Sequence, residues 1–494
     1  MTGSTKYSRE LTDYPTIEGE TKPRVNPHIK DGKLVESLEG CESLLDSYDN
    51  GSKVAGVDSP VLGYRPVIDK SGQVGPFKFL TFAEFKSRFT NFGSGLVSLG
   101  LSPGDRCGLY SPNRIEWVLA EMACYHNNII TVPIYDTLGQ KAIIHVINEA
   151  ELGAIVCTDA KAQFLLGIYD QLDSLKNIIV MDALGDETRK LAEAAGVRVL
   201  GVKDVEELGE REPHESDHRP NRDEIATICY TSGTTGLPKG VMLTHGNFLS
   251  ACASLNYLIE HREVQPITRN DVYLSYLPLA HILERFVVHM LINRGARIAF
   301  YRGDTLKLMD DVQDLSPTVF VGVPRIFNRI HDKVNATVRE KGGLSAKLFH
   351  YALDSKKHYL RHGQTNHWFW DRVVFKSLRD KLGGRVSLIV SGSAPISNDA
   401  LDFLRCSFSA NVLEGYGQTE TTGACALTGL ADTEAGTVGS PFPSCMIKLV
   451  DVPDLGYTVK DKPYPRGEIC VKGNNVFKGY YKQPEKTLET LDKD

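Results

Sequence analysis

Residues 230–240 combine the residue types that a phosphate-binding loop needs. The stretch reads YTSGTTGLPKG and follows the apolar run 225–230, which is typical of a buried strand. Glycines let backbone N–H groups turn toward an anion, hydroxyls add further donors, and Lys239 adds a full positive charge. The spacing differs from the common P-loop because Gly240, not Ser or Thr, follows the lysine. The stretch predicts a loop that binds a nucleotide's phosphates; the alternative is a surface turn rich in Gly and Thr.

Two later stretches repeat this organisation, with an apolar run followed by small residues. Residues 386–397 read VSLIVSGSAPIS, and residues 412–422 read VLEGYGQTETT. Ligands of parallel sheets bind at the carboxyl ends of the strands, so both loops are suited to face one nucleotide. The ring of Tyr416 is suited to stack on a flat base, and Glu420 is suited to hold Mg²⁺ against phosphates. Taken singly, the two stretches are also compatible with a routine strand-to-helix connection and a turn with a packed tyrosine.

Two other stretches mix polar chemistry with apolar sequence. Residues 277–285 (LPLAHILER) place His281 and an ion pair at the start of an apolar helix, where a core or capping histidine is the alternative to a functional one. Residues 366–376 (NHWFWDRVVFK) mix aromatic and basic side chains that could touch a membrane surface. A buried helix face is the favoured interpretation of that second stretch.

Length and composition limit the class of protein. A chain of 494 residues exceeds what one core usually supports, so two or more domains or subdomains are expected. The net charge of -6 provides no electrostatic footprint for nucleic acid. The ten cysteines form no C-x-x-C pair, which favours reduced thiols. We expect no secretory signal and no transmembrane segment, because the most apolar later run, 286–292, is too short to cross a bilayer.

The order of apolar patterns predicts an α/β fold with two related subdomains, mostly parallel sheets flanked by helices, and a smaller β-rich module near the carboxyl end. The expected organisation is an extended arm at 1–75, a first α/β subdomain at 76–205, a polar linker at 206–224, a second α/β subdomain with the three loops at 225–436, and the β-rich module at 437–494. Helices are expected at 82–99, 114–126, 140–149, 280–293, 324–339, 344–361 and 370–381, and strands at 105–110, 129–133, 154–157, 225–230, 272–276, 297–301, 318–323 and 387–390.

Together these stretches resemble the adenylate-forming superfamily, which includes acyl-CoA synthetases, firefly-luciferase-like enzymes and peptide-synthetase adenylation domains. The resemblance lies in residues 230–240, 244–247, 277–285, 323–327, 391–397, 416–420, 467–470 and 479–481. Within the superfamily the chain is most similar to eukaryotic long-chain fatty-acid–CoA ligases, on residues 62–66, 92–96, 111–117 and 135–139.

The resemblance implies a reaction in two steps. The carboxylate of a long-chain fatty acid attacks the α-phosphate of Mg-ATP, which gives an acyl-adenylate and pyrophosphate; the thiol of coenzyme A then displaces AMP. Such chemistry needs alignment and charge neutralisation more than covalent help from the protein. The implied small molecules are therefore ATP, Mg²⁺, a long-chain fatty acid and coenzyme A.

The resemblance also implies roles for individual residues. Lys239, Thr235, Glu420 and His281 form the expected catalytic set, with His281 near the reacting carboxylate and Thr235 and Glu420 near the metal. The expected nucleotide-binding set is Thr231, Ser232, Gly233, Thr234, Thr235, Gly236 and Lys239 on the β- and γ-phosphates, Ser393, Ala394 and Pro395 at the adenine edge, and Tyr416, Gly417 and Thr419 around the base.

The sequence departs from the family pattern at its end. It stops at residues 491–494, where the family continues into a Trp-x-x-Thr-Gly-Asp stretch and a small domain with the adenylation lysine. We therefore expect the large AMP-binding domain of such a ligase. The alternatives are an adenylating enzyme for aromatic, amino or short acids, and a non-catalytic ATP- or acyl-binding protein. By resemblance, peripheral association with the endoplasmic reticulum, peroxisome or lipid droplet is expected; the sequence does not determine the oligomeric state.

Overall fold

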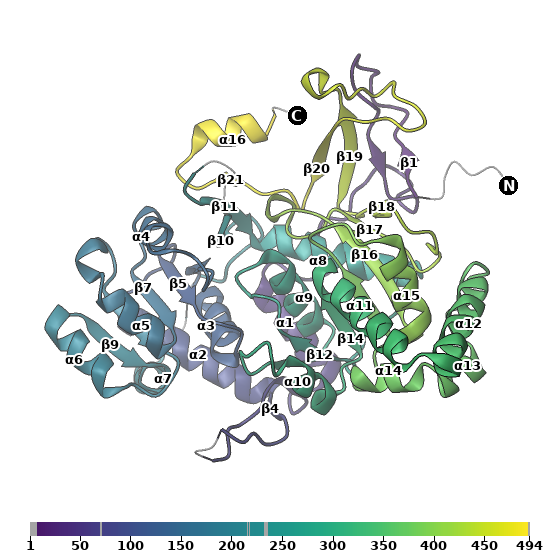
Figure 1. Ribbon diagram of the computed structural model, residues 1–494. Coiled ribbons are helices and arrows are strands. Elements are labelled where there is room, and N and C mark those ends of the chain that lie inside the picture. Colours follow the sequence, from purple (N-terminus) through teal and green to yellow (C-terminus); the bar gives the residue numbers. More distant parts are fainter. Residues whose placement is uncertain (1–6, 70–71, 215, 217, 232–235, 493–494) are drawn as a thin grey trace. The chain divides into compact units, whose positions relative to one another are not determined.

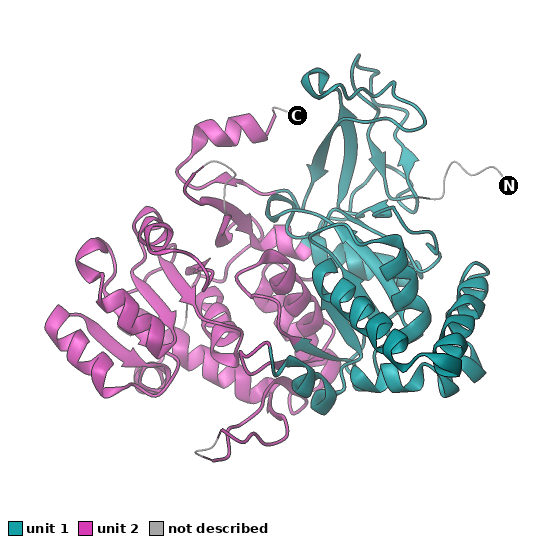
Figure 2. Cartoon of the chain, in the orientation of Figure 1, with its two compact units in different colours: residues 1–38, 250–274, 306–476 teal, residues 39–249, 275–305, 477–494 magenta. Residues whose placement is uncertain are grey.

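The computed structural model describes residues 7–69, 72–214, 216, 218–231 and 236–492 (Figure 1). These residues form two compact units, each of which combines three separate segments of the chain (Figure 2). Unit 1 contains residues 1–38, 250–274 and 306–476, and unit 2 contains residues 39–249, 275–305 and 477–494. The sheets and helices confirm the predicted α/β class. The units are discontinuous in sequence, whereas the boundaries expected from composition divide the chain into continuous segments.

Unit 2 is built on an eight-stranded sheet with the order β21-β11-β10-β6-β5-β7-β8-β9. Its strands are β5 (Arg106–Tyr110), β6 (Ile130–Pro133), β7 (Ala154–Cys157), β8 (Asn177–Val180), β9 (Arg198–Gly201), β10 (Ile225–Thr231), β11 (Lys239–Thr244) and β21 (Gly479–Tyr480). The strands from β10 to β9 in this order are parallel, and β11 and β21 add an antiparallel edge. Parallel strands are buried on both faces, which explains their continuous apolar sequences.

Helices cover this sheet, and a second, smaller group of strands completes unit 2. The helices are α1 (Leu44–Ala55), α2 (Phe82–Ser98), α3 (Ile115–His126), α4 (Gln140–Glu149), α5 (Asp159–Leu166), α6 (Asp186–Ala195), α7 (Val202–Arg211), α9 (Ile282–Asn293) and α16 (Pro484–Thr490), with one 3₁₀ turn, η1 (Tyr169–Gln171). The further strands are β3 (Pro60–Tyr64), β4 (Lys78–Thr81) and β13 (Arg297–Phe300); β3 pairs parallel with β13 and antiparallel with β4.

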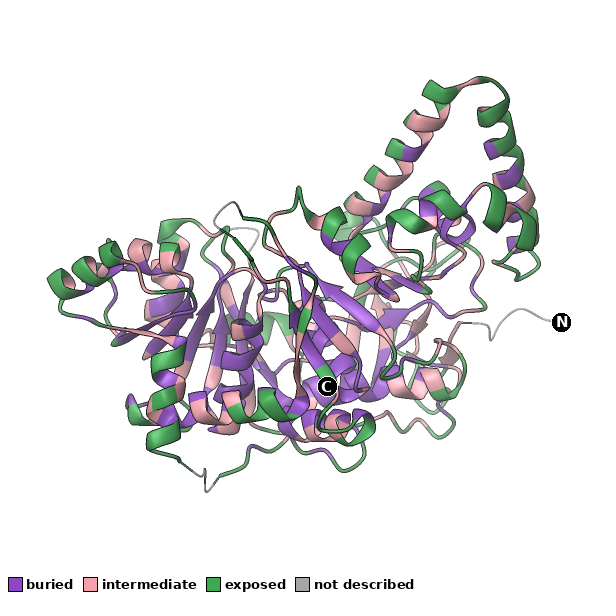
Figure 3. Cartoon of the chain, turned by 90° about the horizontal axis from the view of Figure 1, so that it is seen from below, coloured by how far each residue is buried: buried purple, intermediate pink, exposed green. Residues whose placement is uncertain are grey.

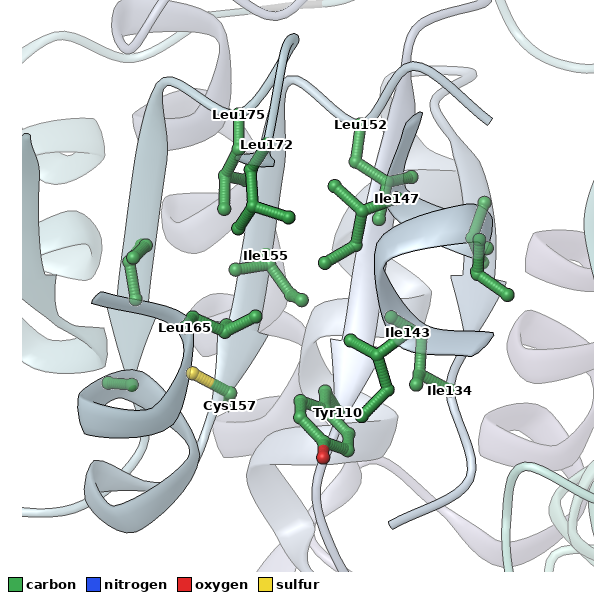
Figure 4. Close-up of a cluster of buried hydrophobic side chains, with 14 of the residues drawn as sticks. Tyr110, Ile134, Ile143, Ile147, Leu152, Ile155, Cys157, Leu165, Leu172 and Leu175 are labelled. Carbon is green, nitrogen blue, oxygen red and sulfur yellow. The ribbon is translucent and has the colours of Figure 1, made fainter. Parts of the chain in front are cut away.

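The apolar core of unit 2 lies between the large sheet and its helices (Figure 4). Ile143 and Ile147 of α4 pack with Ile155 of β7 and with residues that follow the neighbouring strands. Figure 3 shows the strands buried and the outer faces of the helices exposed. The spacing of Ile143, Val146 and Ile147 places them on one face of α4, which is why the sequence predicted this helix with the bounds it has.

Two helices lie in stretches that were expected to be an extended arm and a polar linker. Helix α1 interrupts the stretch 1–75, which was expected to be extended, and α7 occupies the first residues of the expected polar linker at 206–224. Leu44, Leu45 and Tyr48 are buried along α1, and Ser43 with Asp46 forms a capping box at its start. The apolar side chains of α1 are spread among Gly, Ser and Asp, and this composition hid the helix.

Unit 1 contains a set of strands in the order β18-β17-β16-β15-β14-β12. These are β12 (Val272–Ser275), β14 (Val319–Gly322), β15 (Leu388–Ser391), β16 (Asn411–Tyr416), β17 (Ala426–Leu427) and β18 (Ser440–Pro441). The strands from β12 to β16 are parallel, and β17 and β18 are antiparallel to their neighbours. The helices are α8 (His245–Glu260), which begins in unit 2, α10 (Leu308–Leu315), α11 (Pro324–Lys341), α12 (Gly343–Leu360), α13 (Trp368–Val373), α14 (Lys376–Lys381) and α15 (Asn398–Phe408), with the 3₁₀ turns η2 (Thr419–Thr421) and η3 (Pro453–Leu455).

The β-rich module near the carboxyl end is an antiparallel sheet with the order β1-β2-β19-β20. Strands β19 (Cys445–Val450) and β20 (Glu468–Gly473) come from the predicted module. Strands β1 (Arg9–Glu10) and β2 (Arg24–Val25) come from the amino-terminal arm. A strand of two residues has no readable alternation, so the sequence could not show that the arm completes this sheet.

The single helix expected at 370–381 is two short helices, α13 and α14. The break lies at Phe375, whose ring is fully buried and whose N–H donates to the carbonyl of Trp370. The ammonium of Lys356 lies 5.5 Å from the centre of the same ring. Burial of this ring therefore turns the chain at a point where the apolar pattern alone would continue the helix.

The sequence predicted reduced cysteines and no membrane-spanning segment. All ten cysteines lie in the described part of the chain and are free thiols, nine of them buried. Among the described residues, no helix has the length and apolar character needed to span a membrane.

Candidate active site

The predicted phosphate loop connects two antiparallel strands. Strand β10 pairs with β11 in the register Cys229 with Val241, Tyr230 with Gly240 and Thr231 with Lys239. Thr231 and Lys239 are therefore opposite each other at the mouth of the loop, and Lys239 is the first residue of a strand. Ser232, Gly233, Thr234 and Thr235 lie outside the described residues, and Gly236 is exposed.

The ammonium of Lys239 lies over the face of a tyrosine from the end of the chain. Its Nζ is 4.4 Å from the ring centre of Tyr480, which is buried in β21. The N–H of Tyr481 donates to the carbonyl of Gly240 at 2.7 Å, so β21 holds the strand that carries the lysine. A cation over an aromatic face at this distance is attracted to it, so the ring orders the amine.

Helix α4 contacts both arms of this hairpin through two side chains one turn apart. Nε2 of His145 lies 3.1 Å from the carbonyl oxygen of Pro238, and because a carbonyl only accepts, this nitrogen carries the proton. Oε2 of Glu149 accepts from the hydroxyl of Tyr230 at 2.8 Å. Burial and the neighbouring Glu149 both raise the pKa of Tyr230, so its hydroxyl stays protonated as a donor. Sequence reasoning missed both residues; the only signal was their i, i+4 spacing on a predicted helix.

His281 is the residue that caps the amino end of α9. Its Nδ1 accepts from the N–H of Leu283 at 3.2 Å, which leaves Nε2 to carry the proton of the neutral ring. Burial lowers the pKa of His281, so the neutral form is favoured. The structure thus confirms the capping arrangement that was the alternative to a functional role, and the functional role stays a prediction.

Asn113 fixes the loop that precedes His281. Its Nδ2 donates to the carbonyl of Leu277 at 2.6 Å and to the hydroxyl of Ser275 at 2.9 Å. Its Oδ1 accepts from the N–H of Leu279 at 2.9 Å. Asn113 is buried, so these bonds replace the water that its amide would otherwise bind. It belongs to the stretch 111–117 noted in the sequence, where no role was given to it.

A buried arginine joins α9 to the strand that leads into the phosphate loop. Arg285 is 0 % exposed and pairs with Glu121 of α3 at 2.6 Å. Its guanidinium also donates to the hydroxyls of Tyr125 (2.7 Å) and Thr227 (2.9 Å). Thr227 lies in β10, four residues before Thr231. One side chain therefore connects the histidine-bearing helix, α3 and the strand of the phosphate loop.

Electrostatics in this cluster favour the charged pair. Burial alone would raise the pKa of Glu121, but Arg285 and His289 more than offset it and lower that pKa to about 2. Nε2 of His289 lies 3.2 Å from Oε2 of the same carboxylate. His245, buried on the adjacent α8, has its pKa lowered to about 3 by burial and by His289, and is neutral at ordinary pH.

The other two predicted loops lie together in unit 1. Strands β15 and β16 are parallel neighbours, with Ser391 opposite Glu414, so the loops that follow them leave the same edge of the sheet. Oε1 of Glu414 accepts from the N–H of Ile396 at 3.4 Å, which joins the first loop to the second strand. Ser393 is exposed and has a φ of 69°, a left-handed conformation that costs a non-glycine residue about 1–3 kcal/mol and is common at functional sites.

The loop after β16 carries Tyr416, Gly417, Thr419 and Glu420. Thr419 and Glu420 lie in η2 and, like Tyr416, are half-buried. A side chain at position 417 would come within 2.5 Å of the carbonyl oxygen of Gly423, so only glycine fits there. The backbone at Gly417 therefore lies close to the backbone at Gly423, where the loop folds back on itself.

Asn475 anchors this loop from a distant part of the sequence. Its Nδ2 donates to the backbone carbonyls of Thr421 (3.1 Å) and Ala424 (3.0 Å), and its backbone carbonyl accepts from the hydroxyl of Thr422 at 2.7 Å. Asn475 is 0 % exposed. Only its place in the β-rich region could be read from the sequence, because its partners lie more than 50 residues away.

The structure therefore gathers the described site residues into two groups. In unit 2, Thr231, Gly236 and Lys239 lie on one hairpin, and His281 caps a helix that Arg285 ties to the same hairpin strand. In unit 1, residues 393–395 and 416–420 follow adjacent parallel strands. Among the described residues, no three His, Cys, Asp or Glu side chains gather as metal ligands. Mg²⁺ usually takes one or two protein carboxylates and completes its shell with phosphates and water, so the metal role of Glu420 stays a prediction.

Comparison with known proteins decides the family. The profile of the family described as "AMP-binding enzyme" matches residues 63–481. The chain belongs to the AMP-binding enzyme family. The match begins at β3 and ends just after β21, so it includes every loop described above.

Relatives within the AMP-binding family are long-chain acyl-CoA synthetases of eukaryotes. Peroxisomal long chain acyl-CoA synthetase 7 of Arabidopsis thaliana is 43% identical over 88% of this chain and 61% of its own length. Fatty acyl-CoA synthetase A of Dictyostelium discoideum is 40% identical over 99% of this chain and 71% of its own. Long-chain-fatty-acid–CoA ligase 1 of Homo sapiens is 40% identical over 94% of this chain and 65% of its own length. The chain thus spans about 61% of the length of the Arabidopsis relative.

Solved structures of other proteins share the fold. The adenylation domain of a carboxylic acid reductase from Segniliparus rugosus, solved with AMP and a co-purified carboxylic acid, has a TM-score of 0.73 at 22% identity, over 92% of this chain and 71% of that one. The amino-terminal domain of FACL13 from Mycobacterium tuberculosis has a TM-score of 0.64 at 17% identity, over 92% of this chain and 95% of that one.

Proposed function

We propose that this chain activates long-chain fatty acids as the large AMP-binding domain of an acyl-CoA ligase. The overall reaction converts a fatty acid, ATP and coenzyme A into acyl-CoA, AMP and pyrophosphate through an acyl-adenylate. The observation that carries the proposal is 40–43% identity to long-chain acyl-CoA synthetases over most of the chain. Membership of the AMP-binding family adds support, because an adenylate is the product of the first step.

In this proposal the hairpin of unit 2 binds the triphosphate. Lys239 leaves the ring of Tyr480 and pairs with the β- and γ-phosphates, while Thr231 and residues 232–236 contribute N–H and hydroxyl donors. Releasing the lysine from the ring costs little, since a partly exposed cation–π contact is worth about 0.5–1 kcal/mol, less than a charge-assisted hydrogen bond. His145 and Glu149 hold Pro238 and Tyr230 on the two arms of the hairpin.

The loops of unit 1 are assigned to the nucleoside and the metal. Tyr416 stacks on adenine, Ser393, Ala394 and Pro395 contact its edge, and Gly417 and Thr419 line the same position. Glu420, with Thr235, would hold Mg²⁺, which neutralises phosphate charge as pyrophosphate leaves. Asn475 and Glu414 act through these loops by fixing their backbones.

His281 is assigned to the acyl carboxylate. A neutral ring with its proton on Nε2 can donate a hydrogen bond to a carboxylate oxygen without forming an ion pair. This keeps the carboxylate nucleophilic while orienting it, which is the alignment that adenylation requires. Asn113 holds the loop before His281 and so fixes where this donor lies.

ATP–pyrophosphate exchange with a panel of acids tests the substrate class. The assay uses the protein expressed from its complete coding sequence, with palmitate, octanoate, acetate, benzoate and phenylalanine as the acids. We expect palmitate to give the highest rate of exchange when the acids are compared at equal concentration. Its long chain buries the most CH₂ groups, and each buried CH₂ contributes about 0.8 kcal/mol of binding. Glu420→Gln serves as the control and should lower exchange with every acid in proportion. A preference for benzoate, phenylalanine or acetate would show that the chain belongs to an adenylating enzyme for another acid.

A further inference from the structure

Helices α12 and α13 of unit 1 expose an unusual number of large apolar side chains. Of the 23 that are exposed among the described residues, seven lie between positions 344 and 373. They are Leu344, Leu348, Tyr351, Tyr359, Trp368, Phe369 and Val373, and Trp368 is 82% exposed. Single exposed apolar residues are common on soluble proteins, but a cluster of this kind marks an interaction site.

Ring contacts show that the aromatic part of this cluster is continuous. The ring of Tyr351 lies 5.7 Å from that of Trp370, which lies 4.8 Å from Phe369, which lies 5.6 Å from Trp368. Nε1 of Trp370 donates to the hydroxyl of Ser355 of α12 at 3.2 Å. The aromatic side chains of α13 are therefore packed against α12, and the two helices, which lie at the edge of unit 1 in Figure 1, present one surface.

The same two helices are held together from beneath, so the exposed side chains stand on a rigid support. The ammonium of Lys356 pairs with the carboxylate of Asp371, both of them buried, and donates to the hydroxyl of Ser409 at 2.7 Å. Asp371 also caps α13 by accepting from the N–H of His367 at 2.7 Å. Asp371 is buried, whereas Trp368 and Arg372, which lie one turn apart on α13, are exposed.

Charge favours one kind of partner. Residues 343–381 contain eight Lys and Arg against three Asp and Glu, which leaves +5 on a segment of a chain whose net charge is -6. Lys347, Arg361, Arg372, Lys376 and Lys381 are exposed, and Lys347 is one turn from both Leu344 and Tyr351 on α12. Exposed Trp and Tyr side chains beside basic residues suit the headgroup region of an anionic membrane, where aromatic rings sit at the interface and each cation gains about 1 kcal/mol.

We propose that the surface formed by Leu344, Leu348, Tyr351, Trp368, Phe369, Lys347 and Arg372, here called the aromatic-basic surface, binds membranes that contain anionic lipids. The occupant is the lipid surface itself, with the aromatic tips among the headgroups and the basic side chains against lipid phosphates and carboxylates. The proposal does not depend on the ligase activity. The finding also corrects the favoured interpretation of residues 366–376, since Trp368 and Phe369 are exposed and not part of a buried helix face.

Cosedimentation with vesicles tests the proposal. The chain is mixed with phosphatidylcholine vesicles that contain either no anionic lipid or about one third phosphatidylserine. Phosphatidylserine gives the vesicle a negative surface potential, which attracts basic side chains. We expect binding to the phosphatidylserine vesicles, little binding to pure phosphatidylcholine, and loss of binding at high salt. Trp368→Ser and Arg372→Glu should each weaken binding by roughly tenfold or more, since one removes a large ring and the other changes the charge by two units.

Matched variants on other surfaces of unit 1 make the result specific. Tyr464→Ser removes an aromatic side chain that is 78% exposed on another part of unit 1, and Lys33→Glu reverses another exposed charge. Both should bind vesicles like the unchanged chain, and all four variants should keep its melting temperature. Equal binding by Trp368→Ser and the unchanged chain, equal losses in the controls, or no binding to phosphatidylserine vesicles would each overturn the proposal. ATP affinity measured without lipid should not change, which separates this test from the test of the proposed function.

Discussion

Replacing Arg285 with methionine will lower the free energy of unfolding around α9 and β10 by about 3–5 kcal/mol, the usual cost of removing one partner of a buried ion pair. The change leaves the carboxylate of Glu121 buried without its cation, and it removes donors from Tyr125 and Thr227. Methionine fills most of the space, so the loss comes from charge and not from a cavity. Hydrogen exchange of peptides from β10 and α9 measures it directly, without assuming that two units unfold together.

The double variant Arg285→Met with Glu121→Leu is the matched control. It removes both charges, and replacing a whole buried pair by apolar side chains is often close to neutral, so it should recover part of the loss.

Acidification gives a second check. Glu121 has a depressed pKa, so its contribution is present above about pH 4.5 and is lost as pH falls toward 2; this acid-sensitive component should be absent in the variants. A cost below about 1 kcal/mol for the single variant would mean that Arg285 does not tie the helix to the hairpin.

Replacing Lys239 with alanine will weaken ATP binding by about 1.5–3 kcal/mol, the worth of a hydrogen bond to a charged group, or roughly 10- to 150-fold in affinity. The proposed role puts the ammonium on the β- and γ-phosphates, so the loss should be smaller for AMP than for ATP. Calorimetric titration with Mg-ATP and with AMP measures both. The structure adds a graded variant: His145→Ala removes the hydrogen bond to Pro238, together with the contacts of His145 with Glu149 and the ring of Tyr230, and should cost about 0.5–1.5 kcal/mol for ATP.

Lys478→Ala is the control for this series. Lys478 is an exposed lysine in the same unit, just before β21, and its replacement should leave ATP affinity unchanged. If Lys239→Ala binds ATP as tightly as the unchanged chain, the hairpin does not hold the phosphates. If it weakens AMP and ATP equally, the lysine acts on the nucleoside or through the fold instead.

The regular elements that the sequence predicted have local causes. Helix α4 has its predicted bounds since Ile143, Val146 and Ile147 repeat at helical spacing, and β7 is a short apolar run between turns. Loops after parallel strands could be identified as ligand loops, because the carboxyl ends of parallel strands are the usual site of binding. That rule alone is enough to predict that residues 393–395 and 416–420 lie at one edge of a sheet.

What the sequence could not show depends on partners far along the chain. Arg285 was interpreted as one half of an ion pair at the start of a helix, but its partner is Glu121, 164 residues away, and its neighbour Glu284 accepts from Ser275 instead. The stretch 230–240 was predicted to follow a strand, and the antiparallel pairing of that strand with β11 was not predicted. The contact of Lys239 with Tyr480 depends on a residue near the end of the sequence. The role of Asn475 could not be predicted either, because its hydrogen-bond partners lie more than 50 residues away.

The central claim is that one chain holds both an adenylate and a long acyl group, and an analogue of the intermediate tests it most directly. Palmitoyl-sulfamoyl-adenosine replaces the phosphate of the acyl-adenylate with a stable linkage and can be titrated into residues 1–494 without any reaction. We predict that it binds at least about 100-fold more tightly than AMP, the lower end of the range for analogues of activated states. It should also bind far more tightly than the acetyl analogue, because each buried CH₂ adds about 0.8 kcal/mol. Equal affinities for the palmitoyl and acetyl analogues, or no gain over AMP, would contradict the account.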